Sequence, residues 1–171
     1  MERISAGFFQ QKGDQIGPIF RVTMLRFSKR VEYGLMALLE LDASANGGYL
    51  PVKDIAERHE IPQDLLGKVM QALTRAGYVA STKGMHGGYR LVQPLERVTV
   101  GKVIESLEGP VYLTPCCDDS KSCRQQDHCN IRRPILRVQE HLLRYISQLT
   151  LAEFREGDPR PIEMNIGEQC V

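Results

Sequence analysis

The strongest constraint on the fold is a change of hydrophobic period within one short stretch, residues 52–92. Apolar residues recur at helical spacing over 52–59 and again over 63–75, and only a short turn ending in Pro62 separates the two segments. Proline suits the first turn of a helix because its fixed φ matches helical geometry. After Gly77 the period shortens to that of strands, so the stretch predicts two helices followed by β-structure.

The β-structure is predicted to be a hairpin. Residues 78–82 and 89–92 have strand-like patterns, and the glycine-rich loop 83–88 joins them. Helix, turn, helix and hairpin, in this order, are the parts of a winged helix-turn-helix, a fold that binds double-stranded DNA. The expected fold class is therefore mainly α with a small β wing.

The predicted interior of this unit is aliphatic, and the spacing of its members places them on one side of each helix: Ile55, Ala56, Ile61, Leu66, Val69 and Leu73. Glu60 departs from the pattern, because glycine is common at this position of the turn. Another residue costs on the order of 1 kcal/mol there if its φ is positive.

Side chains suited to DNA contact occur in three places: just before the helix that follows Ser28, on the outer side of the helix predicted over 63–75, and in the glycine-rich loop. The candidates are Ser28, Gln63, Asp64, Lys68, Lys83 and His86. Glutamine and lysine reach base edges or phosphates in the major groove, and a cationic loop can follow the backbone and the minor groove. Each feature alone is also common in proteins that bind no DNA, so the combination favours a DNA-binding surface.

Two further helices are expected to complete a DNA-binding domain over 24–109. One follows Ser28, a good N-cap, and the other spans 100–107 after Thr99, a second candidate N-cap.

A long helix is predicted within 132–155, which we interpret as a dimerisation helix. Its apolar residues alternate at spacings of three and four over two heptads: Ile135, Val138, Leu142, Tyr145 and Leu149. Such a seam packs along another helix, either of a second subunit or of the same chain. Residues 156–171 are expected to form a flexible tail. Residues 1–23 are expected to be disordered or a start-site extension, with Met24 as an alternative start.

Four of the five cysteines lie in the segment 110–131, where Cys117, Cys123 and Cys129 are six positions apart. Closely spaced thiolates in a polar loop favour an iron–sulfur cluster, a zinc site or a redox thiol. Zinc sites more often show Cys-x2-Cys pairs, which are absent here, so zinc ranks below a cluster.

The sequence gives weaker support to the other candidate metal ligands, Cys116, Cys170 and His128. Cys116 diverges from its neighbour in the chain and is either a spare thiol or an alternative ligand. Cys170 is expected to take no part. His128 is either a ligand or, as is commoner for a histidine in a polar loop, a solvent-facing side chain.

The composition narrows the possible functions. Lys and Arg number 22 and Asp and Glu 21, so any DNA binding depends on local charge. No apolar run approaches the roughly 18 residues of a membrane span, and no signal-peptide stretch is present, which predicts a cytoplasmic protein with reduced thiols. No phosphate loop, nucleophile elbow or histidine-rich metal helix indicates an enzyme.

Several segments together carry a resemblance to a known family: 25–34 (LRFSKRVEYG), 84–91 (GMHGGYRL), the spaced cysteines before a long helix, and 149–153 (LTLAE). The chain resembles, over about 24–154, the IscR/NsrR family of bacterial winged-helix transcription regulators that carry iron–sulfur clusters. The resemblance implies a homodimer in which the long helix crosses to the partner subunit, and a double-stranded DNA operator as ligand.

The resemblance also implies cluster ligands, and Cys117, Cys123 and Cys129 match its three cysteines. IscR-like members have a histidine where this chain has Arg132, whereas NsrR-like members use a carboxylate at the position of Glu32. We therefore expect Glu32 of the partner subunit as fourth ligand, its alternative being an ordinary surface glutamate. A 4Fe–4S cluster is favoured over 2Fe–2S.

The function implied is a cluster-dependent, DNA-binding transcription regulator that senses cluster status, redox state or nitric oxide. The alternative is a cluster-free thiol-redox regulator of the same fold.

Overall fold

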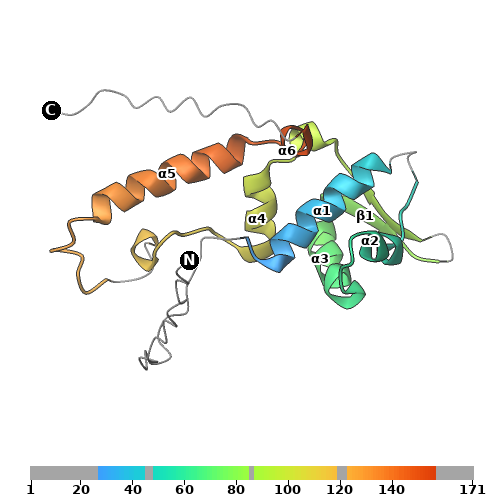
Figure 1. Ribbon diagram of the computed structural model, residues 1–171, viewed down its shortest axis with the longest axis horizontal. Coiled ribbons are helices and arrows are strands. Elements are labelled where there is room, and N and C mark those ends of the chain that lie inside the picture. The colour runs from blue at the N-terminus through green and yellow to red at the C-terminus, as the bar shows by residue number, and fades with distance from the viewer. Residues whose placement is uncertain (1–26, 45–47, 85–86, 119–122, 157–171) are drawn as a thin grey trace, which may run out of the picture.

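The computed structural model describes residues 27–44, 48–84, 87–118 and 123–156. Its helices are α1 (Lys29–Ala43), α2 (Val52–Arg58), α3 (Gln63–Arg75), α4 (Val100–Glu108), α5 (Arg132–Gln148) and α6 (Leu151–Glu156). The strands β1 (Val79–Thr82) and β2 (Gly88–Leu91) and the 3-10 turns η1 (Leu95–Arg97) and η2 (Pro115–Cys117) complete the fold. Figure 1 shows α1 to α4 and the hairpin gathered into one body, from which α5 extends. The predicted winged helix-turn-helix is confirmed.

Helix α1 is the central support of this body. Ser28 caps it as predicted, because its Oγ accepts a hydrogen bond of 3.2 Å from the backbone N–H of Val31. A Cβ at Gly34 would lie 2.6 Å from Cδ1 of Leu107. The small residue therefore lets α1 and α4 cross closely.

The helix-turn-helix has the predicted interior. Leu66, Val69 and Leu73 of α3 are fully buried, and Ile61 in the turn is 5% exposed. The backbone N–H of Ile61 donates to the carbonyl oxygen of Ala56 at 2.8 Å. Glu60 has a φ of 52°, so the suspected strain at this position is real.

The wing is an antiparallel hairpin in which Val79 pairs with Leu91 and Thr82 with Gly88. Each strand lies within one residue of its predicted bounds. Leu50 adds two backbone hydrogen bonds of 2.9 Å to Tyr89. A Cβ at Gly88 would lie 2.4 Å from the carbonyl oxygen of Leu50, so glycine permits this close approach of two backbones.

Thr99 precedes α4 but does not cap it with its side chain, contrary to expectation. Its Oγ1 is buried without a hydrogen-bond partner among the described residues. The backbone of Thr99 instead forms a β-bridge with Thr150, which ties the start of α4 to the end of α5.

The long helix expected from about Arg132 to Leu149 is α5, whereas residues 150–154, expected to add a last turn to it, belong to the separate helix α6. Thr150 and Glu153 form a capping box, in which Thr150 Oγ1 accepts from the Glu153 N–H and Glu153 Oε2 accepts from the Thr150 N–H. This cap starts α6 in a new direction, and Leu151 is fully buried at the winged body. Helix α6 therefore belongs to the core of that body, whereas α5 packs on α4 and extends away from the body (Figure 1).

Candidate DNA-binding surface and cysteine site

The outer side of α3 is polar and exposed. Three residues predicted to contact DNA share it: Gln63, Asp64 and Lys68. Gln71 and Arg75 continue the same side toward the end of the helix. Because the opposite side of α3 is buried in the core, these side chains are the ones that α3 presents to solvent.

A groove of about 430 Å³ separates α3 from the wing. It is lined by Val52 and Lys53 from α2, Gln71 from α3, and Ser81, Thr82 and Lys83 from the hairpin. Two cations, two hydroxyl groups and an amide are donors suited to phosphate oxygens. Lys53 and Gln71 were not predicted as site residues, because only the folded wing brings them beside Lys83.

Gly84 and Gly87 shape the wing next to Lys83. Gly84 has a φ of 114°, which side chains rarely adopt. A Cβ at Gly87 would lie 2.6 Å from the carbonyl oxygen of Thr82. The exposed Lys83 is thereby held on a narrow turn. His86, also predicted to contact DNA, lies outside the described residues.

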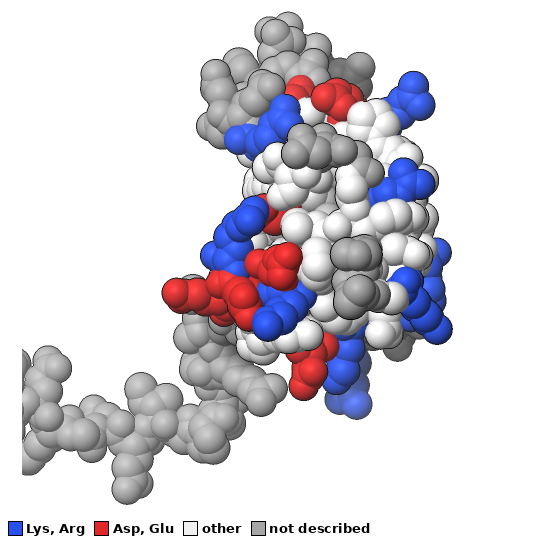
Figure 2. Space-filling view, turned by 90° about the vertical axis from the view of Figure 1, so that its right-hand side faces the viewer, with Lys and Arg blue, Asp and Glu red and all other residues white. Residues whose placement is uncertain are grey.

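Basic side chains are unevenly distributed at the end of the molecule that carries α2 and the wing. In Figure 2 mostly Lys and Arg lie along the right-hand edge of this face, whereas at the left-hand edge acidic side chains are mixed with basic ones. The guanidinium of Arg90, on β2, stacks over the ring of Tyr49 at 5.3 Å. A near-neutral chain can thus present local positive charge.

Ser28 has a structural role in addition to its predicted DNA contact. Its hydroxyl donates a hydrogen bond of 2.9 Å to Oε1 of Glu108, the last residue of α4. Together with its cap of α1, this bond ties the beginning of α1 to the end of α4.

The three evenly spaced cysteines are free thiols with different exposure. Cys117, in η2, is 8% exposed, and its Sγ lies 3.3 Å from Oγ1 of Thr114. Cys123 and Cys129 are half-buried in the turns that follow. His128 is exposed, as its solvent-facing alternative predicts. The side chains of Cys116 and Cys170 lie outside the described part of the chain.

These thiols are not gathered into one ligand set within the described residues of a single chain, where no group of three or more His, Cys, Asp or Glu side chains is close enough to hold a metal ion. The donor chemistry nevertheless fits a soft metal centre, since all three thiols are free. Arg132, where IscR-like members have a histidine, has its Nε buried without a hydrogen-bond partner among the described residues.

Glu32 lies in the first turn of α1, where Lys29 Nζ forms an ion pair of 2.5 Å with its Oε2. Its side chain remains 37% exposed. The carboxylate is therefore accessible to a second chain.

The apolar seam of α5 is only partly covered by its own chain, in which α5 packs on α4 and Leu149 lies against the core. Val138 is 54% exposed, and the other seam residues are only half-buried: Ile135, Leu142, Tyr145 and Leu149. The sequence left open whether this seam packs on the same chain or on a second subunit. Within the chain α5 contacts α4 and η2, while Val138 stays uncovered.

None of the described helices combines the length and the apolar character that crossing a membrane requires.

Comparison with known proteins agrees with this architecture. Residues 27–157 match the Rrf2 family, whose description is iron-dependent transcriptional regulator. Protein rrf2 of Nitratidesulfovibrio vulgaris (Hildenborough) is 30% identical over 129 residues, which are 75% of this chain and 86% of that protein.

Two solved structures show the same fold. CymR, described as the global cysteine regulator of B. subtilis, is 26% identical with a TM-score of 0.62, over 78% of this chain and 98% of that one. IscR of T. potens is 25% identical with a TM-score of 0.61, over 78% and 88%. The chain, with its winged body and extended α5, belongs to the Rrf2 family of transcriptional regulators.

Proposed function

We propose that this regulator binds an iron–sulfur cluster, acts in the cytoplasm as a homodimer, and changes its affinity for a DNA operator when the cluster is lost or altered. The observation that carries the proposal is the set of three free, evenly spaced thiols on the segment between the winged body and α5. This segment follows α4 of the winged body and packs against α5, the helix that carries the apolar seam.

Cys117, Cys123 and Cys129 would hold the cluster, with Glu32 of the partner subunit as fourth ligand and 4Fe–4S favoured over 2Fe–2S. The bound cluster would supply a centre that responds to oxidation and to nitric oxide. An exposed carboxylate supports the role of Glu32, because a ligand donated by a second chain has to be reachable from outside its own.

DNA recognition is assigned to α3 and the wing. Gln63, Asp64 and Lys68 are exposed along α3 and would face base edges in the major groove, where Asp64 can accept from cytosine. Lys83 would contact the backbone or enter the minor groove, and His86 is proposed to act beside it.

Lys53 and Gln71 add to this surface, because they share the groove with Lys83. Ser28 stays a proposed contact at the start of α1.

The homodimer is supported by the exposed seam of α5. A two-heptad apolar stripe that its own chain covers only in part, with Val138 54% exposed, is suited to pack on a second copy. Two copies of α3 would then read two half-sites about one helical turn apart. Because a ligand from one subunit would reach the cysteines of the other, loss of that bond would change the separation of the two α3 helices.

A second candidate is a regulator that responds through thiol oxidation alone. Its support is the presence of free cysteines that the described structure does not gather into a metal site, and the likeness to a cysteine regulator. In that case the cysteines would act as redox thiols rather than ligands.

Selection of double-stranded DNA from a genomic library by the cluster-loaded and the cluster-free protein tests the proposal. The proposal predicts that the loaded form enriches a sequence of two related half-sites, and that removal of the cluster changes affinity for it at least about tenfold. Equal affinity of both forms, with a change on thiol oxidation instead, would favour the second candidate.

A further inference from the structure

We propose that Gln139 of α5 is the positioning residue that holds Cys117 in place, so that the first thiol of the cysteine site and α5 are mechanically one unit. The inference rests on the proposed function only for what Cys117 binds. The anchoring itself is visible in the contacts of a single chain.

Gln139 is unusual within its helix. It is the buried residue of α5, at 9% exposure, whereas the apolar seam residues of the same helix are half-buried or, at Val138, exposed. Burying an amide costs free energy unless the amide is hydrogen-bonded. The Oε1 of Gln139 accepts a hydrogen bond of 2.8 Å from the backbone N–H of Leu113. A buried glutamine at this position is thus explained by the backbone group that it binds.

The bonded residue leads directly to the thiol. Thr114, next to Leu113, uses its carbonyl oxygen to accept the N–H of Cys117 at 3.0 Å. The hydroxyl of Thr114 lies 3.3 Å from the Sγ of Cys117. Gln139 thus holds the backbone of Leu113, and the next residue, Thr114, contacts both the backbone and the sulfur of Cys117. This series of contacts explains why Cys117 is the most buried of the three spaced thiols.

The position of Gln139 on α5 couples the cysteine segment to the apolar seam of that helix. Val138 precedes it by one residue and so points about 100° away around the helix. Ile135 and Leu142 of the seam lie four residues before and three residues after Gln139, on the adjoining side of the helix. The cysteine segment is therefore held at the edge of the apolar seam. A displacement of η2 is transmitted to α5, and through α5 to whatever packs on the seam.

The test is alkylation of the reduced, cluster-free, full-length protein with iodoacetamide, followed thiol by thiol with peptide mass spectrometry. Gln139→Leu removes the acceptor and keeps the side chain's bulk. Gln139→Glu keeps an acceptor oxygen and serves as the matched control. We expect Cys117 to react about tenfold faster in Q139L, which corresponds to the loss of one hydrogen bond in a buried setting, and close to the wild-type rate in Q139E.

Cys123 and Cys129 are internal references, because neither takes part in the contacts just described. Unchanged reactivity of Cys117 in Q139L would overturn the inference, and so would an equal increase at all three thiols, which would indicate general unfolding of α5. If Q139L does not fold, hydrogen exchange of the wild type decides: the Leu113 amide should exchange as slowly as the amides of α5, and fast exchange there would contradict the anchor.

Failure of the proposed function gives a different result. Selective exposure of Cys117 in Q139L, in a protein that binds no iron and sulfide under any anaerobic condition, would support the anchor and overturn only the cluster.

Discussion

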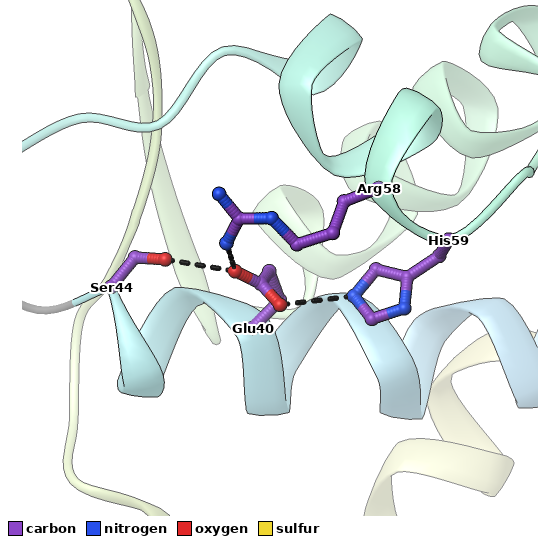
Figure 3. Close-up of polar contacts among 4 residues, drawn as sticks. All are labelled: Glu40, Ser44, Arg58 and His59. Carbon is purple, nitrogen blue, oxygen red and sulfur yellow. Dashed lines mark hydrogen bonds and ion pairs between the residues drawn. The ribbon is translucent and has the colours of Figure 1, made fainter.

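Oε2 of Glu40 lies 3.0 Å from Nε2 of His59, and this contact joins the last turn of α1 to the residue that follows α2. Glu40 also accepts hydrogen bonds from the hydroxyl of Ser44 and from Nη1 of Arg58 (Figure 3). Since α2 is followed directly by the turn into α3, this group fixes the helix-turn-helix on its support.

The charge of Glu40 is maintained by its neighbours. Burial alone raises the pKa of this carboxyl group, but the hydrogen bonds of Ser44 and His59 and the positive charge of Arg58 outweigh it. The pKa of Glu40 is therefore lower than that of a free glutamate. A lowered pKa in the folded state stabilises the fold above the unfolded-state pKa of 4.5 and ceases to do so as the pH falls through the folded-state pKa.

The first prediction concerns Glu40→Gln in the cluster-free protein. We expect the free energy of unfolding at pH 7 to fall by about 2 kcal/mol, because hydrogen bonds to a charged, largely buried group are lost. The difference from the wild type should stay constant down to about pH 5 and shrink below pH 4.5. Urea unfolding at several pH values measures it. Glu57→Gln, at an exposed ion pair with Lys53, is the control and should change stability by less than about 0.5 kcal/mol.

The second prediction concerns the strained turn. Glu60→Gly should raise the free energy of unfolding by up to about 1 kcal/mol, because glycine adopts a φ of 52° without the clash of a Cβ. Glu60→Ala removes the same charge but keeps the Cβ, so it should give no such gain. Equal effects of both substitutions would mean that charge, rather than backbone strain, governs this position.

The third prediction concerns phosphate contacts. Lys83→Gln and Lys53→Gln should each lower the slope of log affinity against log salt by about one for a DNA duplex. Fluorescence anisotropy titrations of the DNA duplex at several salt concentrations, from about 50 to about 200 mM, measure this slope. Lys102→Gln changes the net charge equally, at an exposed site on α4 away from the groove, and should leave the slope unaltered. A slope that responds equally to all three changes would contradict a phosphate site in the groove.

The fourth prediction concerns α5. Val138→Glu should convert a dimer into a monomer at micromolar concentration, because it places a charge in the centre of the exposed apolar seam. Sedimentation velocity measures the assembly. Arg137→Gln changes the adjacent exposed side chain without touching the seam and should leave the dimer intact. A V138E protein that stays dimeric would require another interface.

The fifth prediction concerns Glu32. Glu32→Ala should accelerate loss of an iron–sulfur cluster on exposure to air and alter DNA affinity, whereas Glu32→Asp, which keeps a carboxylate, should retain part of both properties. The decay of visible absorption gives the rate. If E32A matched the wild type in both respects, Glu32 would be the surface glutamate that pairs with Lys29.

Much of the winged body followed from the sequence because it depends on local patterns. The stripe of Leu66, Val69 and Leu73 and the cap by Ser28 are properties of a single helix, and the structure confirms them. The break before α6 was also encoded locally, by Thr150 and Glu153, but we expected residues 150–154 to extend the long helix by a last turn.

The features that escaped prediction join distant segments. The groove brings Lys53 beside Lys83, Glu40 meets Arg58 and His59 across two helices, and Gln139 binds a backbone group 26 residues away. None of these partners is specified by spacing along the chain, because each depends on how the helices pack.

The most direct test of the central claim is the iron and acid-labile sulfide content of the protein after anaerobic purification or reconstitution, read together with its visible absorption. The account predicts iron and sulfide in equal amounts in the wild type, their loss when Cys117, Cys123 and Cys129 are all replaced by alanine, and their retention in Cys170→Ala. A colourless wild type without iron and sulfide, or a triple variant that binds as much of both as the wild type, would contradict it.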